Sequence, residues 1–354
     1  MKTKEQLLAV LEENRGVPVS GEAIAERLSV SRAAVWKAVK ELEKAGYVIH
    51  AATKKGYSLA EENDILSEQG IRAALQAAIS DDSKRDSKIE GLHPEIFVYP
   101  SVDSTNIVAK QLAIGGATHG TVVIAESQTA GRGRFGRDFF SPPGCSVYMS
   151  VILRPMELRF VVPTLVTTMA AVAVCEAVES IMGDASENSP APKIKWVNDV
   201  FLRGKKICGI LSEAVTDFES GEIEWIVVGI GVNFREPKDG FPDEIKETAG
   251  AVFPEQNAHL PPVKTSFKTP TRNRLIAEII ERLHKLNMAG NADFMQSYRD
   301  RLMYIGEKVT VRGAGAAQAY EATALGVDDI GGLIVQTADG EKLTLSSGEV
   351  SVRG

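Results

Sequence analysis

The stretch Glu126-Ser-Gln-Thr-Ala-Gly-Arg-Gly-Arg-Phe-Gly-Arg-Asp138 decides how the rest of this chain is interpreted. An apolar run over residues 121–125 precedes it and predicts a buried strand. Glycine lets a backbone approach a ligand closely, and the planar, charged guanidinium of arginine suits carboxylates and phosphates. The stretch alternates these two residue types, at Gly131, Arg132, Gly133, Arg134, Gly136 and Arg137. It lacks the Gly-Lys-Ser/Thr of a Walker loop and predicts either a mobile loop that closes over an anion or a solvated basic loop.

The charge distribution divides the chain into a small basic segment and a larger acidic one. Residues 1–60 contain ten Lys/Arg and seven Asp/Glu, although the 354 residues together have a net charge of −7. This length predicts two or three domains, and the negative total argues against a protein that coats nucleic acid. No signal peptide or apolar run of membrane-spanning length is present, so we expect a cytoplasmic protein without a membrane partner. Because the cysteines lack metal-ligand spacing, we expect no metal site and buried thiols at Cys145, Cys175 and Cys208.

The basic segment has the pattern of a winged helix-turn-helix. Apolar spacing and capping serines predict three short helices, at residues 4–14, 20–28 and 31–42. The unit spans about Gly21 to Lys40, and its second helix would enter the DNA major groove by its N-terminal end. Residues 46–59 predict a hairpin wing with lysines for phosphates. The DNA-binding candidates are Ser31, Arg32, Trp36, Lys37, Lys54 and Lys55. The alternative is a helical module that binds another protein.

The acidic segment begins with a helix and a linker and then reaches a polar triplet at a second helix start. Ser67 to Ile79 predicts the first helix, and residues 80–87 predict a mobile linker or an exposed loop. Ser104 or Asp103 can cap the next helix. The free amides of a helix N-terminus favour polar ligand atoms. A Ser-Thr-Asn triplet at such a position is nevertheless more often only a helix cap. Two hydroxyls and an amide lie here, on Ser104, Thr105 and Asn106.

The middle of the chain predicts an antiparallel meander that contains unusual glycines. Strand patterns separated by short turns lie at residues 193–202, 206–215 and 225–234. Strand period places Trp196 and Asn198 on one face. The same period places Gly229, Gly231 and Asn233 together on one face of their strand. Two glycines in a strand interior indicate that something packs against the bare backbone, either a neighbouring element or a ligand.

Together these patterns predict a multidomain α+β fold. The N-terminal part is a winged helix-turn-helix domain over residues 1–62, followed by a linker and connecting helix over 63–95. A central α/β domain over 96–304 contains a mixed, mostly antiparallel sheet and a buried helix from Leu165 to Met182. Short β-type runs separated by glycine turns predict an SH3-like β-barrel over 305–354.

Five motifs in succession resemble the biotin–protein ligase family. Each is weak alone, but together they are specific and cover nearly the whole chain. They are Ser104-Thr-Asn106, Gln128-Thr-Ala-Gly-Arg-Gly-Arg-Phe-Gly-Arg137, Lys195-Trp-Val-Asn-Asp199, Lys206-Ile-Cys-Gly-Ile-Leu211 and Gly229-Ile-Gly-Val-Asn233. The N-terminal module is similar to that of the bifunctional bacterial type, which is also the biotin operon repressor. The chain departs from the family pattern at Phe135, where a second arginine is frequent, and at Val197, where proline is usual.

The resemblance implies an enzyme that attaches biotin to a protein in two steps. ATP, with Mg²⁺, would activate the biotin carboxylate as biotinyl-5′-AMP, and a lysine of a biotin carboxyl carrier domain would then attack it. Lys206 and Arg134 would be the catalytic residues. Biotin would contact Ser104, Thr105, Asn106, Gln128, Arg132, Gly133, Arg134, Trp196 and Lys206. ATP and the adenylate would contact Arg132, Arg134, Arg137, Asn198, Lys206 and Asn233.

The resemblance also implies regulation of biotin genes. The adenylate-bound protein would form a homodimer and bind operator DNA as a repressor. Three alternatives stay open at this point. The first is a lipoyl ligase or octanoyltransferase that uses Cys208 as a thioester nucleophile. The second is a ligand-responsive transcription factor with a degenerate enzyme domain, and the third is a ligase whose N-terminal module does not bind DNA.

Overall fold

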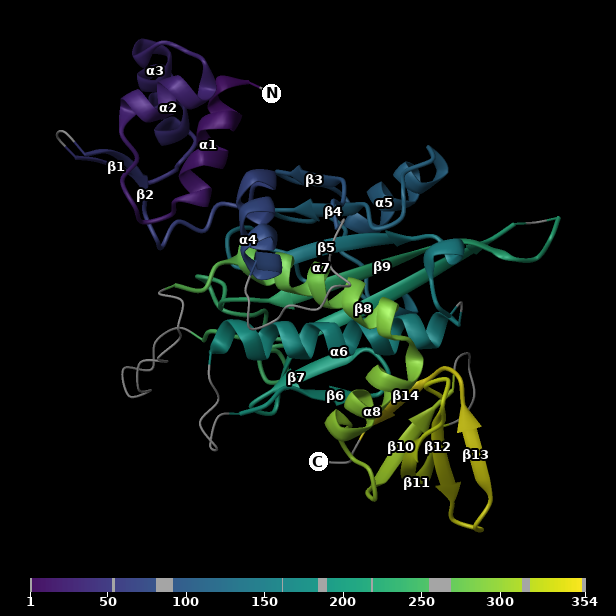
Figure 1. Ribbon diagram of the computed structural model, residues 1–354. Helices are drawn as coiled ribbons and strands as arrows, with labels where there is room; N and C mark the ends of the chain where they lie inside the picture. Colours follow the sequence, from purple (N-terminus) through teal and green to yellow (C-terminus); the bar gives the residue numbers. More distant parts are fainter. Residues whose placement is uncertain are drawn as a thin grey trace. The chain divides into compact units, whose positions relative to one another are not determined.

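The computed structural model describes residues 2–52, 55–80, 92–160, 162–183, 190–217, 219–254, 269–313 and 319–351. The chain divides into two compact units (Figure 1). The first unit comprises residues 1–87, 180–184 and 263–281, and the second comprises the remainder.

The N-terminal part of the first unit is a three-helix module with a two-stranded wing, as predicted. Ser20 and Ser31 cap the second and third helices, because each hydroxyl accepts a hydrogen bond from the backbone N–H three residues further on. Ser29, with a φ of 54°, makes the turn between these helices. The elements are α1 (Thr3–Glu13), α2 (Gly21–Leu28), α3 (Arg32–Lys44), β1 (Ile49–Ala52), β2 (Gly56–Leu59) and α4 (Glu68–Ser80).

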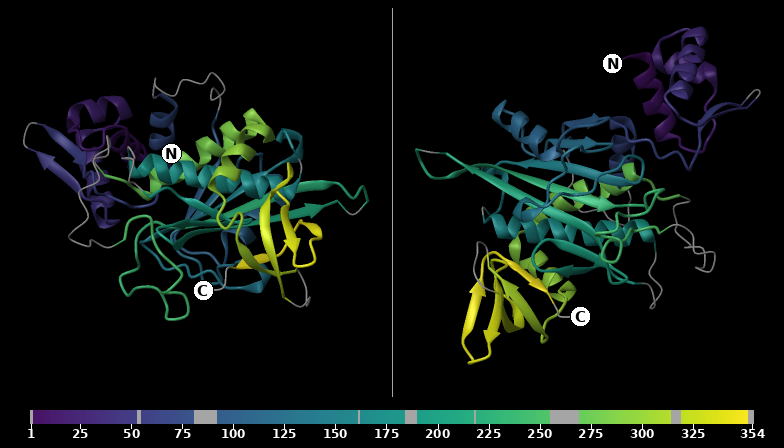
Figure 2. Two further views of the ribbon diagram at one scale, coloured as in Figure 1. Left: turned by 90° about the horizontal axis from the view of Figure 1, so that it is seen from below. Right: turned by 180° about the vertical axis from the view of Figure 1, so that it is seen from behind.

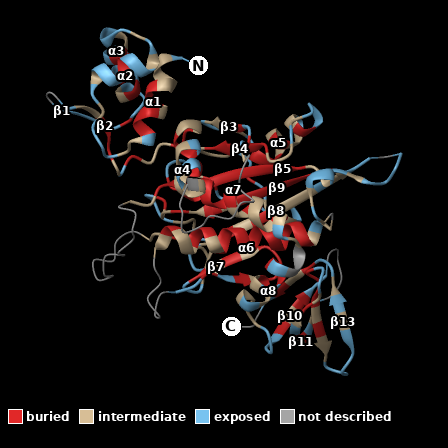
Figure 3. Ribbon diagram, in the orientation of Figure 1, coloured by how far each residue is buried: buried red, intermediate tan, exposed pale blue. Residues whose placement is uncertain are grey.

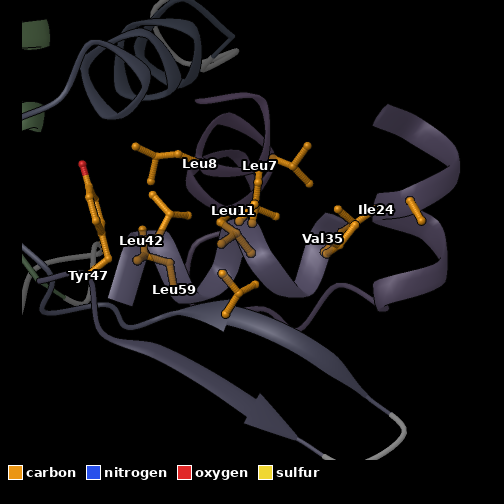
Figure 4. Close-up of a cluster of buried hydrophobic side chains, with 12 residues drawn as sticks. Leu7, Leu8, Leu11, Ile24, Val35, Leu42, Tyr47 and Leu59 are labelled. Carbon is orange, nitrogen blue, oxygen red and sulfur yellow. The ribbon is translucent and has the colours of Figure 1, made fainter. Parts of the chain in front are cut away.

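An aliphatic core holds this module together (Figure 4). Side chains that are at most 1% exposed converge from the three helices and the wing, at Leu7, Leu11, Ile24, Val35, Leu42 and Leu59. Burying a side chain of this size contributes about 1.5–3 kcal/mol to stability. The outer face of α3 is not covered by this core, and Trp36 on that face is 57% exposed. A bulky aromatic side chain is therefore available there to a partner.

The start of α7 (Arg272–Ala289) holds the segment that follows the wing. Asp64 accepts hydrogen bonds from both the backbone N–H and the guanidinium of Arg272. Asn273 accepts a hydrogen bond from the backbone N–H of Ser67 and donates one to the carbonyl of Ile65. Within the predicted linker, residues 63–67 are therefore fixed, whereas residues 81–91 lie outside the described part of the chain.

The second unit is built on a seven-stranded mixed sheet in the order β3-β4-β5-β9-β8-β7-β6. Its strands are β3 (Ile96–Tyr99), β4 (Val122–Ala125), β5 (Ser146–Leu153), β6 (Lys193–Lys195), β7 (Asp199–Leu202), β8 (Lys205–Thr216) and β9 (Ile223–Asn233). The β3–β4 pair is parallel and the other five neighbouring pairs are antiparallel. The predicted mixed, mostly antiparallel sheet is confirmed.

Helices cover the sheet and bury its central strands (Figures 2 and 3). The helix α6 (Pro163–Met182) is long and apolar enough to span a membrane by length and composition, contrary to the expectation that no such run is present. Because 78% of that apolar window is buried inside the unit, α6 is a core helix. This unit also contains α5 (Thr105–Ile114), which packs on β4, β5 and β9, and α8 (Asn291–Arg301).

One strand prediction is wrong. The run over residues 193–202 is two short strands, β6 and β7, which pair with each other around a turn at residues 196–198. Asn198 and Asp199 are residue types that favour turns, and here this preference prevails over the strand preference of the apolar residues on either side. The turn sends Trp196 and Asn198 to different surroundings, so strand period does not apply to them.

The C-terminal segment forms an open antiparallel sheet in the order β13-β12-β11-β10-β14. Its strands are β10 (Lys308–Arg312), β11 (Tyr320–Val327), β12 (Leu333–Thr337), β13 (Lys342–Leu345) and β14 (Glu349–Ser351). The predicted strands are present, but over residues 305–313 and 319–351 no pairing of β13 with β14 closes the sheet into a barrel.

Candidate functional site

A cleft in the second unit gathers most of the residues predicted to bind a ligand. It lies where the arginine loop (residues 126–138), the start of α5, and the strands β5, β8 and β9 meet. The predicted residues that line it are Ser104, Thr105, Asn106, Gln128, Arg132, Gly133, Arg134, Arg137, Asn198 and Lys206. Segments more than one hundred residues apart in sequence thus contribute to one cavity.

The start of α5 is capped from outside the helix rather than by its own serine. Ser104 occupies the N-cap position but makes no capping hydrogen bond through its side chain. Instead, Gln128 Oε1 accepts hydrogen bonds from the backbone N–H and the hydroxyl of Thr105, at 2.9 and 3.2 Å. The amide nitrogen of Gln128 donates to Ser141 Oγ at 2.9 Å. The base of the arginine loop is therefore fixed to the helix N-terminus.

The buried floor beneath α5 is polar and closely packed. Asn106 is 4% exposed, and its Oδ1 lies 2.6 Å from the hydroxyl of Ser150. Gly229 on β9 makes room for this amide, because a Cβ at that position would lie 2.2 Å from Asn106 Oδ1. At this glycine the packing interpretation is correct: a neighbouring side chain occupies the space.

The other two glycines of the floor face an aromatic ring. A Cβ on Gly231 would lie 2.6 Å from the ring of Phe139, and one on Gly209 would lie 3.3 Å from it. The ring of Phe139 also meets that of Tyr148 edge-on, with centroids 6.4 Å apart. These glycines line the cleft, so a flat apolar ring is accommodated over bare backbone.

Lys206 is the ammonium group of the cleft, and it is paired with a carboxylate. Its Nζ lies 2.8 Å from Asp199 Oδ1, and both side chains remain partly exposed. The backbone of Lys206 is held by the loop that follows β9, through hydrogen bonds with Thr248 and Gly250. A compact ammonium on a fixed strand suits the bridging of two anionic groups.

Side-chain contacts place the arginine loop over the cleft. Arg134 donates a hydrogen bond to Asn198 Oδ1 at 3.0 Å, and its guanidinium lies 4.9 Å from the ring centre of Phe135. Arg137 forms a two-pronged ion pair with Glu349 of β14. Burial lowers the pKa of Arg134, but a guanidinium remains protonated at any physiological pH. The loop thus brings guanidinium groups to the lining of the cleft.

Two predicted ligand contacts lie elsewhere. Trp196 is 4% exposed and does not line the cleft. Its indole N–H donates to the carbonyl of Gly331, between β11 and β12, at 2.9 Å. The turn after β6 directs it there. The side chain of Asn233 donates to the carbonyl of Gly250 at 2.9 Å and does not line the cleft either. Both residues stabilise neighbouring segments in this structure.

Several residues of the site were not predicted. Phe139, Asp199 and Glu349 line the cleft, and Ser150 and Glu213 bond to its floor. Asp199 lies inside the quoted Lys195–Asp199 motif, so its carboxylate could have been noticed. No local pattern connects Glu349 with a loop more than two hundred residues earlier.

Cys208 is unsuited to nucleophilic chemistry. It is 1% exposed, does not line the cleft, and burial raises its pKa well above the ordinary thiol value. The octanoyltransferase alternative loses its nucleophile. Cys145 and Cys175 are also buried thiols, as predicted. Among the described residues, no group of three or more His, Cys, Asp or Glu side chains could hold a metal ion.

The DNA-binding candidates that the structure describes lie at α3 and at the wing of the first unit. Ser31 is the N-cap of α3, and its hydroxyl is engaged by the N–H of Ala34. The other α3 candidates, Arg32, Trp36 and Lys37, are exposed on the helix, as is Lys55 after the wing turn. Lys54 lies outside the described residues.

Fold and cleft together define a class: a chain with a helix-turn-helix module and an α+β domain that has a cationic ligand cleft. The sequence model of the biotin/lipoate A/B protein ligase family matches residues 98–233. An HTH domain matches residues 3–58, and the biotin protein ligase C-terminal domain matches residues 304–353.

Similar proteins agree with this class. The bifunctional ligase/repressor BirA of Bacillus spizizenii is 33% identical, covering 93% of this chain and 92% of the relative, and that of Bacillus subtilis is 32% identical. The structure of the biotin protein ligase from Aquifex aeolicus in complex with biotin and ATP is 26% identical, with a TM-score of 0.55, and covers 74% of this chain and 99% of that one. The chain belongs to the biotin protein ligase family, and to its bifunctional ligase/repressor type.

Proposed function

We propose that this protein activates biotin with ATP to give biotinyl-5′-AMP and transfers the biotin to a lysine of a biotin carboxyl carrier domain. One observation carries the proposal: a single cleft is lined by two kinds of group, neutral hydrogen-bonding side chains at the start of α5 and the cations Lys206, Arg132 and Arg134. Biotin has the same division, a neutral ureido ring at one end and a carboxylate at the other. The bound ATP of the Aquifex relative supports the choice of co-substrate.

The ureido ring would lie at the start of α5. Ser104, Thr105, Asn106 and Gln128 offer both donors and acceptors there, and a buried urea needs each of its groups paired. Gly133 and Arg132 would cover the ring from the loop. Trp196 is not part of this proposal, because its indole is committed to Gly331.

The reacting groups would meet beside Lys206. A carboxylate oxygen of biotin attacks the α-phosphorus of ATP, a new P–O bond forms, and pyrophosphate leaves. Lys206 would lie between the two anions and lower their repulsion, and Arg134 would stabilise the charge on the phosphoryl oxygens. Mg²⁺ enters with ATP as part of the substrate. Arg137, Asn198 and Asn233 would contact the nucleotide, Asn233 only after its bond to Gly250 opens.

Transfer needs no nucleophile from the enzyme. The acceptor lysine attacks the acyl carbon as a neutral amine, the amide bond forms, and AMP leaves with the bonding electrons. Asp199, which lies 2.8 Å from Lys206 in the cleft, would receive the proton that the amine loses. The adenylate is a mixed anhydride that water can attack, so closure of the arginine loop would protect it.

The N-terminal module would make the enzyme a repressor of biotin genes in the cytoplasm. When acceptor protein is scarce the adenylate persists, and the liganded protein would form a homodimer that presents two α3 helices to a palindromic operator. The bifunctional name of the two Bacillus relatives supports this role. Arg32, Trp36 and Lys37 would reach the major groove, and Lys54 and Lys55 the phosphates. The C-terminal segment over residues 305–354 would be an SH3-like domain built on the open sheet β13-β12-β11-β10-β14.

The enzyme assay combines the protein with ATP, biotin and a biotin carboxyl carrier domain. We expect the mass of the carrier domain to rise by one biotinyl group, and no mass change would refute the ligase. For the repressor, operator affinity is compared with and without biotin plus ATP. Equal affinities would refute co-repression, and Lys37→Glu should weaken binding to operator while leaving carrier biotinylation intact.

A further inference from the structure

The side chain of Lys206 reaches the cleft because β8 is irregular at this point. In a regular strand, residues three positions apart lie on opposite faces of the sheet. Lys206 and Gly209 nevertheless share the cleft face: both line the cleft, and a Cβ on Gly209 would lie 3.4 Å from Lys206 Nζ. The strand between these two residues must therefore depart from the regular alternation.

The irregularity is a β-bulge at Ile207. Consecutive residues of β7 pair with Lys206 and Cys208, so Ile207 between them is left without a partner in the described β7–β8 ladder. A bulge of this kind sets two residues of one strand against one of its neighbour and changes the direction of a side chain. Here it turns Lys206 to the face of Gly209, whose partner across the ladder is Asp199. The ion pair between Lys206 and Asp199 depends on this turn.

A segment after β9, residues 248–252, holds the other edge of the bulged strand. The described ladder between β8 and β9 begins at Cys208, so Lys206 lies beyond its end. There the N–H of Lys206 donates to the carbonyl of Thr248 at 2.7 Å, and the carbonyl of Lys206 accepts from the N–H of Gly250 at 2.9 Å. The 248–252 segment thus takes the place of β9 beside the bulge.

The 248–252 segment is itself tied to its neighbours and passes very close to β8. The carbonyl of Gly250 accepts a hydrogen bond from Asn233, and that of Val252 accepts one from Arg203 at 3.2 Å. A Cβ on Gly250 would lie 2.5 Å from the Cβ of Lys205, and neither atom is the far end of a flexible side chain. Any residue larger than glycine must therefore move the segment away from β8.

We propose that Gly250 is a positioning residue of the ligase reaction. Its lack of a side chain lets the 248–252 segment bond to both backbone groups of Lys206, and this keeps the ammonium over Gly209 and beside Asp199. The inference rests on the proposed function, in which Lys206 bridges the two reacting anions. Gly250 lies outside the lining of the cleft and acts through the backbone of Lys206.

The first test is Gly250→Ala. We expect kcat for adenylate formation, measured by pyrophosphate exchange, to fall about tenfold or more, because Lys206 loses its alignment. The KM for biotin should stay within about threefold, since the groups at the start of α5 are not touched. Gly221→Ala in the β8–β9 turn is the matched control: its φ of 71° also disfavours a side chain, but no described atom lies within 4 Å of the new Cβ. It should lower stability without lowering kcat.

The second test repeats Gly250→Ala in a Lys206→Gln background. A residue that acts through the Lys206 ammonium has nothing left to position there, so we expect the remaining activity to fall by less than about twofold. A glycine that only supports the fold would cost the same factor in both backgrounds.

A milder variant and a measurement without substrate cover the case in which Gly250→Ala folds poorly. Arg203→Met removes the hydrogen bond to Val252 and adds no clash, and we expect a two- to fivefold loss of kcat, at roughly the energy of one hydrogen bond. Amide hydrogen exchange at Lys206 should be faster in both variants, because its N–H depends on the carbonyl of Thr248. Gly221→Ala should leave that exchange unchanged.

The outcomes separate this inference from the proposed function. Unchanged kcat and unchanged exchange at Lys206 in Gly250→Ala and Arg203→Met would overturn it, as would an equal loss of activity in the Lys206→Gln background. A wild-type protein that does not biotinylate the carrier domain would refute the proposed function. Faster exchange at Lys206 in Gly250→Ala would, even then, support the placement of Lys206 by Gly250.

Discussion

The two sides of the cleft are held in different ways. The floor under α5 consists of side chains that are at most 4% exposed and bonded to one another, such as Thr105, Asn106 and Ser150. The base of the arginine loop is fixed to the start of α5, and a backbone hydrogen bond joins Gly133 to Arg137. The tip of the loop is held to the rest of the unit by side-chain contacts, those of Arg134 with Asn198 and Arg137 with Glu349. A neutral ring needs partners fixed in advance, whereas a triphosphate must enter and pyrophosphate must leave. The rigid floor and the adjustable loop match these two needs.

Removal of the ammonium should have the largest effect. Lys206→Gln deletes the charge that bridges the two reacting anions, so we expect adenylate formation, measured by pyrophosphate exchange, to fall at least about a hundredfold. Lys205→Gln is the control, because that neighbouring side chain points to the carbonyls of residues 246 and 247. A loss of less than tenfold in Lys206→Gln would mean that the loop alone brings the anions together.

Charge reversal in the loop should separate function from folding. Arg134→Glu places a carboxylate beside the phosphates, and we expect adenylate formation and retention to fall by about ten- to a hundredfold. The melting temperature should change little, because the side chain makes one hydrogen bond to Asn198. If Arg134→Glu unfolds the protein, the loop is a structural element and the comparison with the floor fails.

A pair of glycine substitutions compares the two sides directly. In the floor, the Cβ of Gly229→Ala would lie 2.2 Å from Asn106 Oδ1, so we expect a stability loss of about 1–3 kcal/mol and weaker biotin binding. In the loop, the Cβ of Gly133→Ala would lie 3.3 Å from the carbonyl of Arg137, which has to move by only a few tenths of an ångström. Its cost should be within about 0.5 kcal/mol. Urea unfolding of both variants measures the difference, and equal losses would contradict it.

The ion pair between Arg137 and Glu349 should have the smallest effect. Because Arg137 is 61% exposed, solvent screening limits the pair to about 0.2–1 kcal/mol. The hydrogen bond from Arg137 lowers the pKa of Glu349, so the contribution is present above the ordinary carboxyl pKa and is lost as the pH falls through the lowered value. The stability difference between wild type and Glu349→Gln should therefore vanish in acid. A difference that persists at low pH would show that Glu349 acts through packing.

Sequence reasoning was most successful where the information is local. The capping serines Ser20 and Ser31 and the short turn between them define the helix-turn-helix, because caps and periodicity act within a few residues. The succession of five motifs located most of the cleft. It failed at Trp196, where a strand pattern hides a turn and the side chain finds its partner in Gly331, more than a hundred residues away.

The same limit explains the rest of the site. Ser104 has the sequence signature of a helix cap, but the capping group is the amide of Gln128, which arrives from another loop. The glycines of β9 could be assigned neither to packing nor to a ligand until Asn106 and Phe139 were seen against them. Closure of the C-terminal sheet depends on pairing between distant strands, which short β runs do not specify.

The three tryptophans stand in three unlike surroundings, which makes intrinsic fluorescence selective. Trp36 on α3 is 57% exposed, whereas Trp196 and Trp225 are at most 4% exposed. A water-soluble quencher such as iodide should quench the fluorescence of Trp36 but not that of the two buried tryptophans. Added operator should therefore reduce quenching only by covering the recognition helix α3. The indole of Trp196, bonded to Gly331, should shift its emission to the red if the C-terminal sheet separates from the turn after β6. One unlabelled chain therefore carries separate optical signals for its DNA-binding helix and for its C-terminal contact.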